Sequence, residues 1–377
     1  MMRSMKQGML GGMTLIFVWL FVCAPMAGAA GTIKMGVAGA HSGDLASYGL
    51  PTVKAAELVV KKINAEGGVL GKPVELVVED DQCKTEVAVN VATKLITEDV
   101  DVVLGHICSG PCKASLGIYA DKGVILMSPS ATNTDLTKSG QHHNFFRTIA
   151  PDDAQAKTQI DFCLNTLKAK TIAIVHDKGD YGKGLAEFAR NFLEADKRGT
   201  LVLFEGITPG AVDYSAVINK VKRSKADVLL YGGFHPEASK LVQQMRRKQM
   251  KTVFISDDGV KDITFIKVAG QYAEGVYATG PVDTTKNPMA IAAIAEHQKA
   301  YGSDPGAFYL NAYAAATAML EGIRIAGSTD FDALSNALRN NYFETPLGRI
   351  SFDANGDAIG VGFAVFQVRD GQYAEVQ

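Results

Sequence analysis

The sequence predicts an α/β protein made of two similar halves, each built around a doubly wound parallel sheet. After residue 30, short apolar runs of strand length alternate with segments whose apolar residues recur with a period near 3.6. This alternation occurs over residues 33–127 and again over residues 154–256, which indicates two units of ordinary domain size in tandem. A length of 377 residues is also typical of about two domains.

In the first half, strands are expected at 33–38, 74–79, 100–104 and 124–127, with helices at 52–65, 86–97 and 114–121. These strands are rich in apolar residues, as is typical of parallel strands buried on both faces. The first helix is expected to end before Gly67 and Gly68, since glycine commonly follows a helix.

In the second half, strands are expected at 171–176, 201–206, 228–231 and 252–256, with helices at 154–167, 183–195, 214–223 and 236–249. Residues 288–339 are predicted to be mainly helical. A hairpin is expected around Asn355-Gly356, because this dipeptide between apolar runs is the strongest short-range hairpin signal.

The charge balance argues against binding to nucleic acid. The chain has 38 basic and 40 acidic residues, a formal net charge of −2, so it has no long-range field that would attract a polyanion.

The first 30 residues are predicted to be a secretory signal peptide. Arg3 and Lys6 precede the apolar run 13–26, and the small residues 27–30 follow, which is the order that such signals have. The alternative of a membrane anchor is disfavoured because the run is shorter than about 20 residues and Pro25 interrupts its end. Lipid attachment at Cys23 is a second alternative, disfavoured by the bulk of Val22.

An exported chain meets an oxidising compartment, where disulfides form. The cysteines after the signal are Cys83, Cys108, Cys112 and Cys163, and four cysteines allow three complete pairings. No Cys-x-x-Cys motif and no zinc-like histidine spacing is present, so no metal site and no cofactor is expected.

Candidate binding residues are expected at the carboxyl ends of the strands, where open α/β sheets bind ligands. Ser109 follows one strand and is expected to cap the next helix, whose free N–H groups would suit an anion. Thr132 follows the next strand in a hydroxyl-rich turn, and Asp257-Asp258 follows a strand of the second half. The acidic pair suits an ammonium group. The simpler interpretation of Ser109 is an ordinary helix cap, and the simpler interpretation of the other two segments is a turn.

Three other patterns are interpreted as ordinary loops. The glycines of residues 176–184 have neither the Walker A nor the Rossmann spacing. Residues 353–357 resemble a calcium loop, but the glycine comes two places early and no bidentate acid follows. The seven histidines are scattered, and His142-His143 lies in a polar loop without a carboxylate or nucleophile nearby in sequence, which gives catalysis little support.

Taken together, the strand-end segments resemble the periplasmic leucine/isoleucine/valine-binding proteins of ABC importers, which have the type I periplasmic binding fold. The matching segments extend over nearly the whole chain after the signal: GVAGAHSGDLASYG (36–49), INAEGGVLGKPVELVVEDDQC (63–83), GHICS (105–109), SPSAT (128–132), AIVHDKGDYGKGLAE (173–187), YGGFHPEA (231–238), GAFYLNAYAA (306–315) and SFDANGD (351–357).

The resemblance implies two Rossmann-like lobes joined by three crossovers, with ligand trapped between them. The expected N-terminal lobe is 31–150 plus 282–362, and the expected C-terminal lobe is 151–281 plus 363–377. It further implies a monomeric periplasmic receptor that delivers an aliphatic α-amino acid to an inner-membrane ABC permease. Cys83 and Cys108 match the family's disulfide pair; Cys112 and Cys163 have no assigned partner, and Cys112 is expected to be free or to compete with Cys83 for Cys108.

The same resemblance implies a set of ligand-binding residues. Ser109 and Thr132 match positions that bind the α-carboxylate, supported by backbone groups near Ser130. Asp258 matches a glutamate that pairs with the α-ammonium, and Tyr181 matches a tyrosine that closes over the ligand. The other matching positions line the pocket: Tyr48, Phe234 and Phe308.

Two departures from the family pattern leave other ligands open. Asp258 is one methylene shorter than the family's glutamate, and Phe234 lacks the hydroxyl of the family's tyrosine. The alternatives are γ-aminobutyrate, an amide, an aromatic amino acid or an aromatic acid. An enzyme, such as a hydrolase that uses Cys112 or Ser109 with a histidine, is the alternative from a different functional class.

Overall fold

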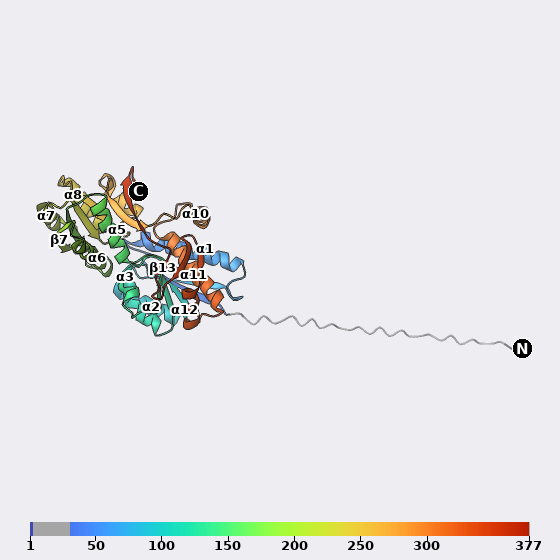
Figure 1. The fold of residues 1–377 in the computed structure, drawn as a ribbon. Coiled ribbons are helices and arrows are strands. Elements are labelled where there is room, and N and C mark those ends of the chain that lie inside the picture. The colour runs from blue at the N-terminus through green and yellow to red at the C-terminus, as the bar shows by residue number, and fades with distance from the viewer. Residues whose placement is uncertain (3–30, 377) are drawn as a thin grey trace. The chain divides into compact units, whose positions relative to one another are not determined.

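Two sheets with helices on both faces organise the chain, as the computed structural model shows (Figure 1). The structure describes residues 1–2 and 31–376, so the expected signal peptide lies almost wholly outside the described residues. Residues from Thr32 onward form a unit of their own.

The first sheet has five parallel strands in the order β2-β1-β3-β4-β5. Its strands are β1 (Ile33–Gly39), β2 (Val74–Asp80), β3 (Val102–Leu104), β4 (Ile125–Ser128) and β5 (Phe145–Arg147). The helices of this half are α1 (Ala46–Ala65), α2 (Thr85–Thr97), α3 (Ser109–Ala120), α4 (Asp135–Lys138), α10 (Pro288–Tyr301), α11 (Tyr309–Ala326) and α12 (Phe331–Asn340).

Alternate residues of these strands face two separate cores. Val102 and Leu104 pack in the core that α1 and α11 cover, whereas Val103 packs with residues of α2 and α3. This explains why the strands have apolar residues at successive positions, since neither face of the sheet meets water.

The second sheet has seven strands in the order β15-β14-β10-β9-β8-β6-β7. They are β6 (Thr171–His176), β7 (Thr200–Gly206), β8 (Val228–Gly232), β9 (Val253–Ser256), β10 (Tyr277–Pro281), β14 (Phe363–Arg369) and β15 (Gln372–Glu375). The helices of this half are α5 (Asp152–Asn165), α6 (Asp180–Asp196), α7 (Ser215–Ser224), α8 (His235–Arg247), α9 (Ile263–Ala269) and the 3₁₀ helix η1 (Gly270–Ala273). Only β14 pairs antiparallel with its neighbours, so the sheet is parallel from β10 to β7.

The chain passes between the two halves three times, from β5 to α5, from β10 to α10 and from β13 to β14. A small third sheet lies in the first half and consists of β11 (Phe343–Thr345), β12 (Gly348–Phe352) and β13 (Ala358–Ile359). The predicted fold class, two doubly wound halves joined by three crossovers, is therefore confirmed.

Several predicted element boundaries were wrong. The first helix begins at Ala46, six residues early, with Pro51 inside its second turn, and α3 begins at Ser109 instead of residue 114. The expected hairpin forms between β12 and β13. The apolar run after the turn does not form a single strand, because its second part is β14, which pairs with β10 of the second sheet. The pattern of apolar residues does not show which sheet a strand joins.

Candidate functional site

A cavity lies where the carboxyl ends of strands from both sheets meet. It is lined from the first half by Tyr48, Ile107, Cys108, Ser109, Ser130 and Phe308, and from the second half by Tyr181, Phe234, Asp258 and Gly259. Seven of the eight predicted ligand-binding residues are therefore brought together, and Thr132 is the exception. We call this space the cleft cavity.

Tyr48 reaches the cavity because α1 packs closely on the loop that follows β1. A Cβ atom at Gly49 would lie 1.9 Å from the carbonyl oxygen of Ala40, so only glycine allows this approach. The neighbouring Tyr48 is 2% exposed and extends toward the second half. In the sequence, the close approach of α1 to this loop is indicated by the glycine that directly follows Tyr48.

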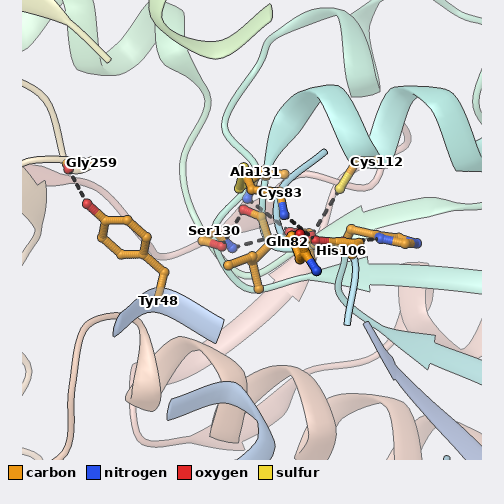
Figure 2. The surroundings of a disulfide bond; sticks show 12 residues. Tyr48, Gln82, Cys83, His106, Cys112, Ser130, Ala131 and Gly259 are labelled. Carbon is orange, nitrogen blue, oxygen red and sulfur yellow. Dashed lines mark hydrogen bonds and ion pairs between the residues drawn. A yellow bond between two sulfur atoms is a disulfide. The ribbon is translucent and has the colours of Figure 1, made fainter. Parts of the chain in front are cut away.

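The hydroxyl of Tyr48 forms two hydrogen bonds across the cavity. It donates to the carbonyl oxygen of Gly259 (Figure 2) and lies 2.5 Å from Nδ1 of His235. A hydroxyl has a single hydrogen, so His235 donates its Nδ1–H to Tyr48. Sequence reasoning missed His235 and Gly259, since nothing near them in the chain indicates a partner about 200 residues away.

Ser109 is the first residue of α3 and does not cap it, which corrects the sequence prediction. Cys108 is the cap residue, and Ser109 Oγ instead accepts a hydrogen bond from the N–H of Asn133, at 3.2 Å. The first N–H groups of α3 still lack acceptors within the helix, as in every α-helix. This helix start adjoins the cavity and carries the partial positive charge that favours an anion.

Ser130 lines the cavity, whereas Thr132 does not. The Ser130 hydroxyl donates to the carbonyl oxygen of Ile107, at 2.7 Å, and its N–H is directed to Ser128 Oγ, at 3.3 Å. Thr132 is fully buried and does not line the cavity, and its hydroxyl has no hydrogen-bond partner among the described residues.

Asp258 is the buried carboxyl group of the cavity. Its Oδ1 accepts hydrogen bonds from the Tyr181 hydroxyl, at 2.5 Å, and from the Gln155 amide, at 2.9 Å. Burial raises the pKa of Asp258, and these two hydrogen bonds oppose the rise by stabilising the ionised form. Burial also raises the pKa of Tyr181 well above its usual value, so its hydroxyl stays protonated and donates.

Gln155 is a functional candidate that sequence reasoning missed. It lies on α5 and also donates to Thr279 Oγ1 of β10, at 2.9 Å, which links two of the three crossovers to Asp258. A glutamine in an amphipathic helix looks like a solvent-facing residue, and only the fold shows that it is buried.

Four aromatic rings complete the lining. The ring centres of Tyr48 and Phe308 are 6.0 Å apart, those of Tyr48 and Phe234 are also 6.0 Å apart, and those of Tyr181 and Phe234 are 5.3 Å apart. Such a lining suits an apolar side chain.

The other member of the acidic pair, Asp257, does not line the cavity. Its Oδ2 accepts from the N–H of Gly233, at 2.8 Å, and its Oδ1 has no partner among the described residues. Burial raises the pKa of Asp257 well above its usual value. Asp258 alone of the pair faces the cavity.

The predicted disulfide between Cys83 and Cys108 is confirmed (Figure 2), and Cys108 lines the cavity. Cys112 and Cys163 are free and buried. The thiol of Cys112 donates to the carbonyl oxygen of His106, at 3.0 Å, and burial raises its pKa, so it is not a competent nucleophile.

No group of three or more potential metal ligands occurs in the part of the chain that the structure describes. None of the helices formed by these residues is both long enough and apolar enough to cross a membrane.

The cleft cavity has a negative pole and a positive pole with aromatic rings around them. Asp258 comes from the second half, whereas the start of α3 comes from the first, so a bound zwitterion would join the halves. In the closed arrangement the open space is about 20 Å³, which admits about one water molecule.

Comparison with known proteins agrees with this geometry. The sequence profile described as "Periplasmic binding protein" matches residues 32–372. The leucine-, isoleucine-, valine-, threonine- and alanine-binding protein of Pseudomonas aeruginosa is 37% identical over 340 residues, which cover 90% of each chain. The Leu/Ile/Val-binding protein of Escherichia coli K12 is 36% identical over 335 residues, or 89% of this chain and 90% of that one.

Solved structures show the same fold. The leucine-binding protein LivK of Thermotoga maritima superposes with a TM-score of 0.85 at 25% identity, covering 92% of this chain and 98% of that one. The substrate-binding protein LivJ of Streptococcus pneumoniae, solved in complex with isoleucine, has a TM-score of 0.82 at 29% identity and coverages of 92% and 100%.

Proposed function

The chain belongs to the periplasmic binding protein family, and from this premise we propose that it traps an aliphatic, branched-chain α-amino acid between its two halves. It is a solute-binding receptor, not an enzyme. The receptor delivers its ligand to an inner-membrane ABC permease and works as a monomer in the periplasm, where residues 1–30 direct it.

One observation carries this proposal: Asp258 and the start of α3 face one cavity from opposite halves. The carboxylate pairs with the α-ammonium, while Ser109, the N–H groups of α3 and Thr132 receive the α-carboxylate. Thr132 Oγ1 is a buried hydroxyl that has no partner within residues 31–376, and a ligand oxygen approaching in the bound state would satisfy it.

The remaining lining residues hold the aliphatic side chain. Tyr48, Phe234 and Phe308 present ring faces without a charge, and Tyr181 closes over the ligand while donating to Asp258. In this proposal the moving bodies are residues 31–150 with 282–362 and residues 151–281 with 363–377. Closure brings Asp258 toward the first body, so ligand binding favours the closed state.

The proposal is tested with the chain from residue 31 onward, freed of any ligand that copurifies. Thermal unfolding is followed with each of the common amino acids, and with γ-aminobutyrate, short amides and benzoate. A ligand at about 100 times its dissociation constant stabilises the protein by about 2.7 kcal/mol. Leucine, isoleucine or valine should give the largest shift, and a shift with γ-aminobutyrate, amides or benzoate alone would contradict the proposal.

Asp258→Asn tests the ammonium partner. Leaving a buried ammonium without its carboxylate should weaken binding of leucine by 100-fold or more, about 3 kcal/mol. The matched control is Asp257→Asn, because Asp257 is the adjacent buried carboxyl but does not line the cavity. Equal affinities of the two variants, measured by calorimetry, would contradict the assigned role.

A further inference from the structure

A second and larger cavity lies behind Phe308. Its volume is about 350 Å³, and it shares Asp258 and Phe308 with the cleft cavity. The ring of Phe308 is therefore a common wall between a narrow space and a wide one. Phe308 also has a left-handed backbone, with φ of 59°, a conformation that is uncommon for a bulky residue and is often found at functional sites.

The wide cavity contains one cationic side chain, Lys261, so we call it the Lys261 cavity. The ammonium group of Lys261 forms no hydrogen bond and no ion pair with any residue that the structure describes. It lies 3.9 Å from the ring centre of Phe366, which holds it without using its N–H donors. Those donors remain available to a guest in the cavity.

The position of Lys261 is fixed by the fold. Its N–H donates to the carbonyl oxygen of Asp258, at 3.2 Å, so one turn after β9 carries both side chains. The stem of Lys261 crosses Gly280 of β10, where a Cβ atom would lie 2.1 Å from Lys261 Cδ. The same turn therefore presents a carboxyl group to the cleft cavity and an ammonium group to the Lys261 cavity.

The charges around Lys261 decide which guest fits. Asp283, Glu375 and Asp258 all act on its ammonium through their charge, although none forms an ion pair with it. Burial outweighs these acids and lowers the pKa of Lys261. Three nearby carboxyl groups repel an added anion, whereas a neutral oxygen accepts a hydrogen bond from Lys261 without that repulsion.

We propose that the Lys261 cavity extends the ligand site and accepts the end of a long amino-acid side chain that carries a neutral acceptor oxygen, such as a carboxamide. The side chain passes Phe308 when that ring turns aside, and its oxygen accepts a hydrogen bond from Lys261. This inference rests on the proposed function, because Asp258 and α3 must first hold the ammonium and carboxylate of the same ligand.

The test measures calorimetric affinities for leucine, norleucine, glutamine, glutamate and the homologue of glutamine that is one methylene longer. In the native chain glutamine should bind more tightly than glutamate, because of the three carboxyl groups. In Lys261→Met, which keeps a similar stem, the affinity for glutamine relative to norleucine should fall about tenfold. The control Lys267→Met removes an exposed lysine of α9 and should leave this ratio unchanged.

Two further variants test the geometry. Gly280→Ala keeps the lysine but displaces its stem, so it should lower the same ratio. Phe308→Ala opens the shared wall and should improve binding of the longer homologue relative to leucine by about tenfold. Folding of each variant is checked by thermal unfolding.

A glutamine-to-norleucine ratio that stays within twofold in Lys261→Met would overturn the proposal. Glutamate binding as tightly as glutamine in the native chain would overturn the choice of a neutral oxygen. If leucine still binds in either case, the extension has failed and the amino-acid receptor stands. If no amino acid binds the native chain, the proposed function itself has failed.

Discussion

At the scale of single residues, the ionisation of Asp258 depends on its two hydrogen-bond donors. Burial disfavours the carboxylate, whereas Tyr181 and Gln155 stabilise it. A ligand ammonium binds the ionised form, so affinity is lost as the pH falls through the pKa of Asp258. Gln155 does not line the cavity, and we infer that it acts on the ligand through Asp258 as a positioning residue.

Replacing Gln155 should therefore change both the affinity and its pH dependence. In Gln155→Leu the pKa of Asp258 rises further, so the acid midpoint of leucine binding should move to higher pH. The affinity at neutral pH should fall by roughly tenfold, the usual effect of one hydrogen bond to a charged group. Calorimetric titrations between pH 4 and 8 measure both quantities.

Gln159→Leu is the matched control for this prediction. Gln159 lies one turn along α5 and also donates to Thr279 Oγ1, but its other acceptor is the carbonyl oxygen of Ser256 and not Asp258. A purely structural role for Gln155 would give both variants the same midpoint as the native chain, which would refute its link to Asp258.

At the scale of elements, α1 contacts the turn after β9 and the start of α8 through Tyr48. These hydrogen bonds join the two halves without any contribution from ligand. Tyr48→Phe keeps the ring but removes both bonds, so the closed state should lose stability. The dissociation rate of leucine should increase by roughly tenfold, as measured by stopped-flow fluorescence.

Tyr373→Phe controls for the loss of a tyrosine hydroxyl. Its hydroxyl donates to the carbonyl oxygen of Val260, at 2.5 Å, in the same turn after β9, but both residues belong to the second half. An increase in dissociation rate of similar size in both variants would indicate general loosening of the turn, not loss of a bond between halves.

The elements also show how far sequence reasoning extends. The alternating strands and helices were predictable because apolar periodicity reports burial on each face. The first turns of α1 and α3 were not, because their buried residues, such as Tyr48 and Ser109, face the cleft and do not form an amphipathic pattern. The sequence also did not indicate the sheet that β14 joins, since five of its seven residues pair with β10, more than 80 residues earlier.

For the candidate site, strand ends and the family resemblance indicated residues that do gather at one cavity. Gln155, His235 and Lys261 were missed because their roles depend on contacts between distant segments. Thr132 was expected at the cavity from its strand-end position, but it is fully buried and is not among the residues that line the cavity. Local sequence gives the edge of a sheet at which a side chain lies, whereas packing decides which way it faces.

At the scale of the whole molecule, buried carboxyl groups make stability depend on pH. Burial raises the pKa of Asp177 to about 6, and it raises the pKa of Asp152, Asp257 and Asp258 as well. Between the unfolded and folded pKa values the folded chain binds more protons than the unfolded chain. The free energy of unfolding therefore decreases as the pH rises through this interval.

For Asp177 the interval extends from about pH 4 to about pH 6. One pKa unit corresponds to about 1.4 kcal/mol, so Asp177 contributes up to about 3 kcal/mol to the decrease in the free energy of unfolding. The asparagine in Asp177→Asn keeps an oxygen that can accept from the N–H of Gly179, but this side chain cannot ionise. The free energy of unfolding of this variant should therefore decrease less over the interval, by up to about 3 kcal/mol. Urea unfolding of the ligand-free chain at several pH values measures it, with the exposed Asp121→Asn as control. If the native chain and Asp177→Asn lose stability equally over this interval, the fold does not raise the pKa of Asp177 above its unfolded value.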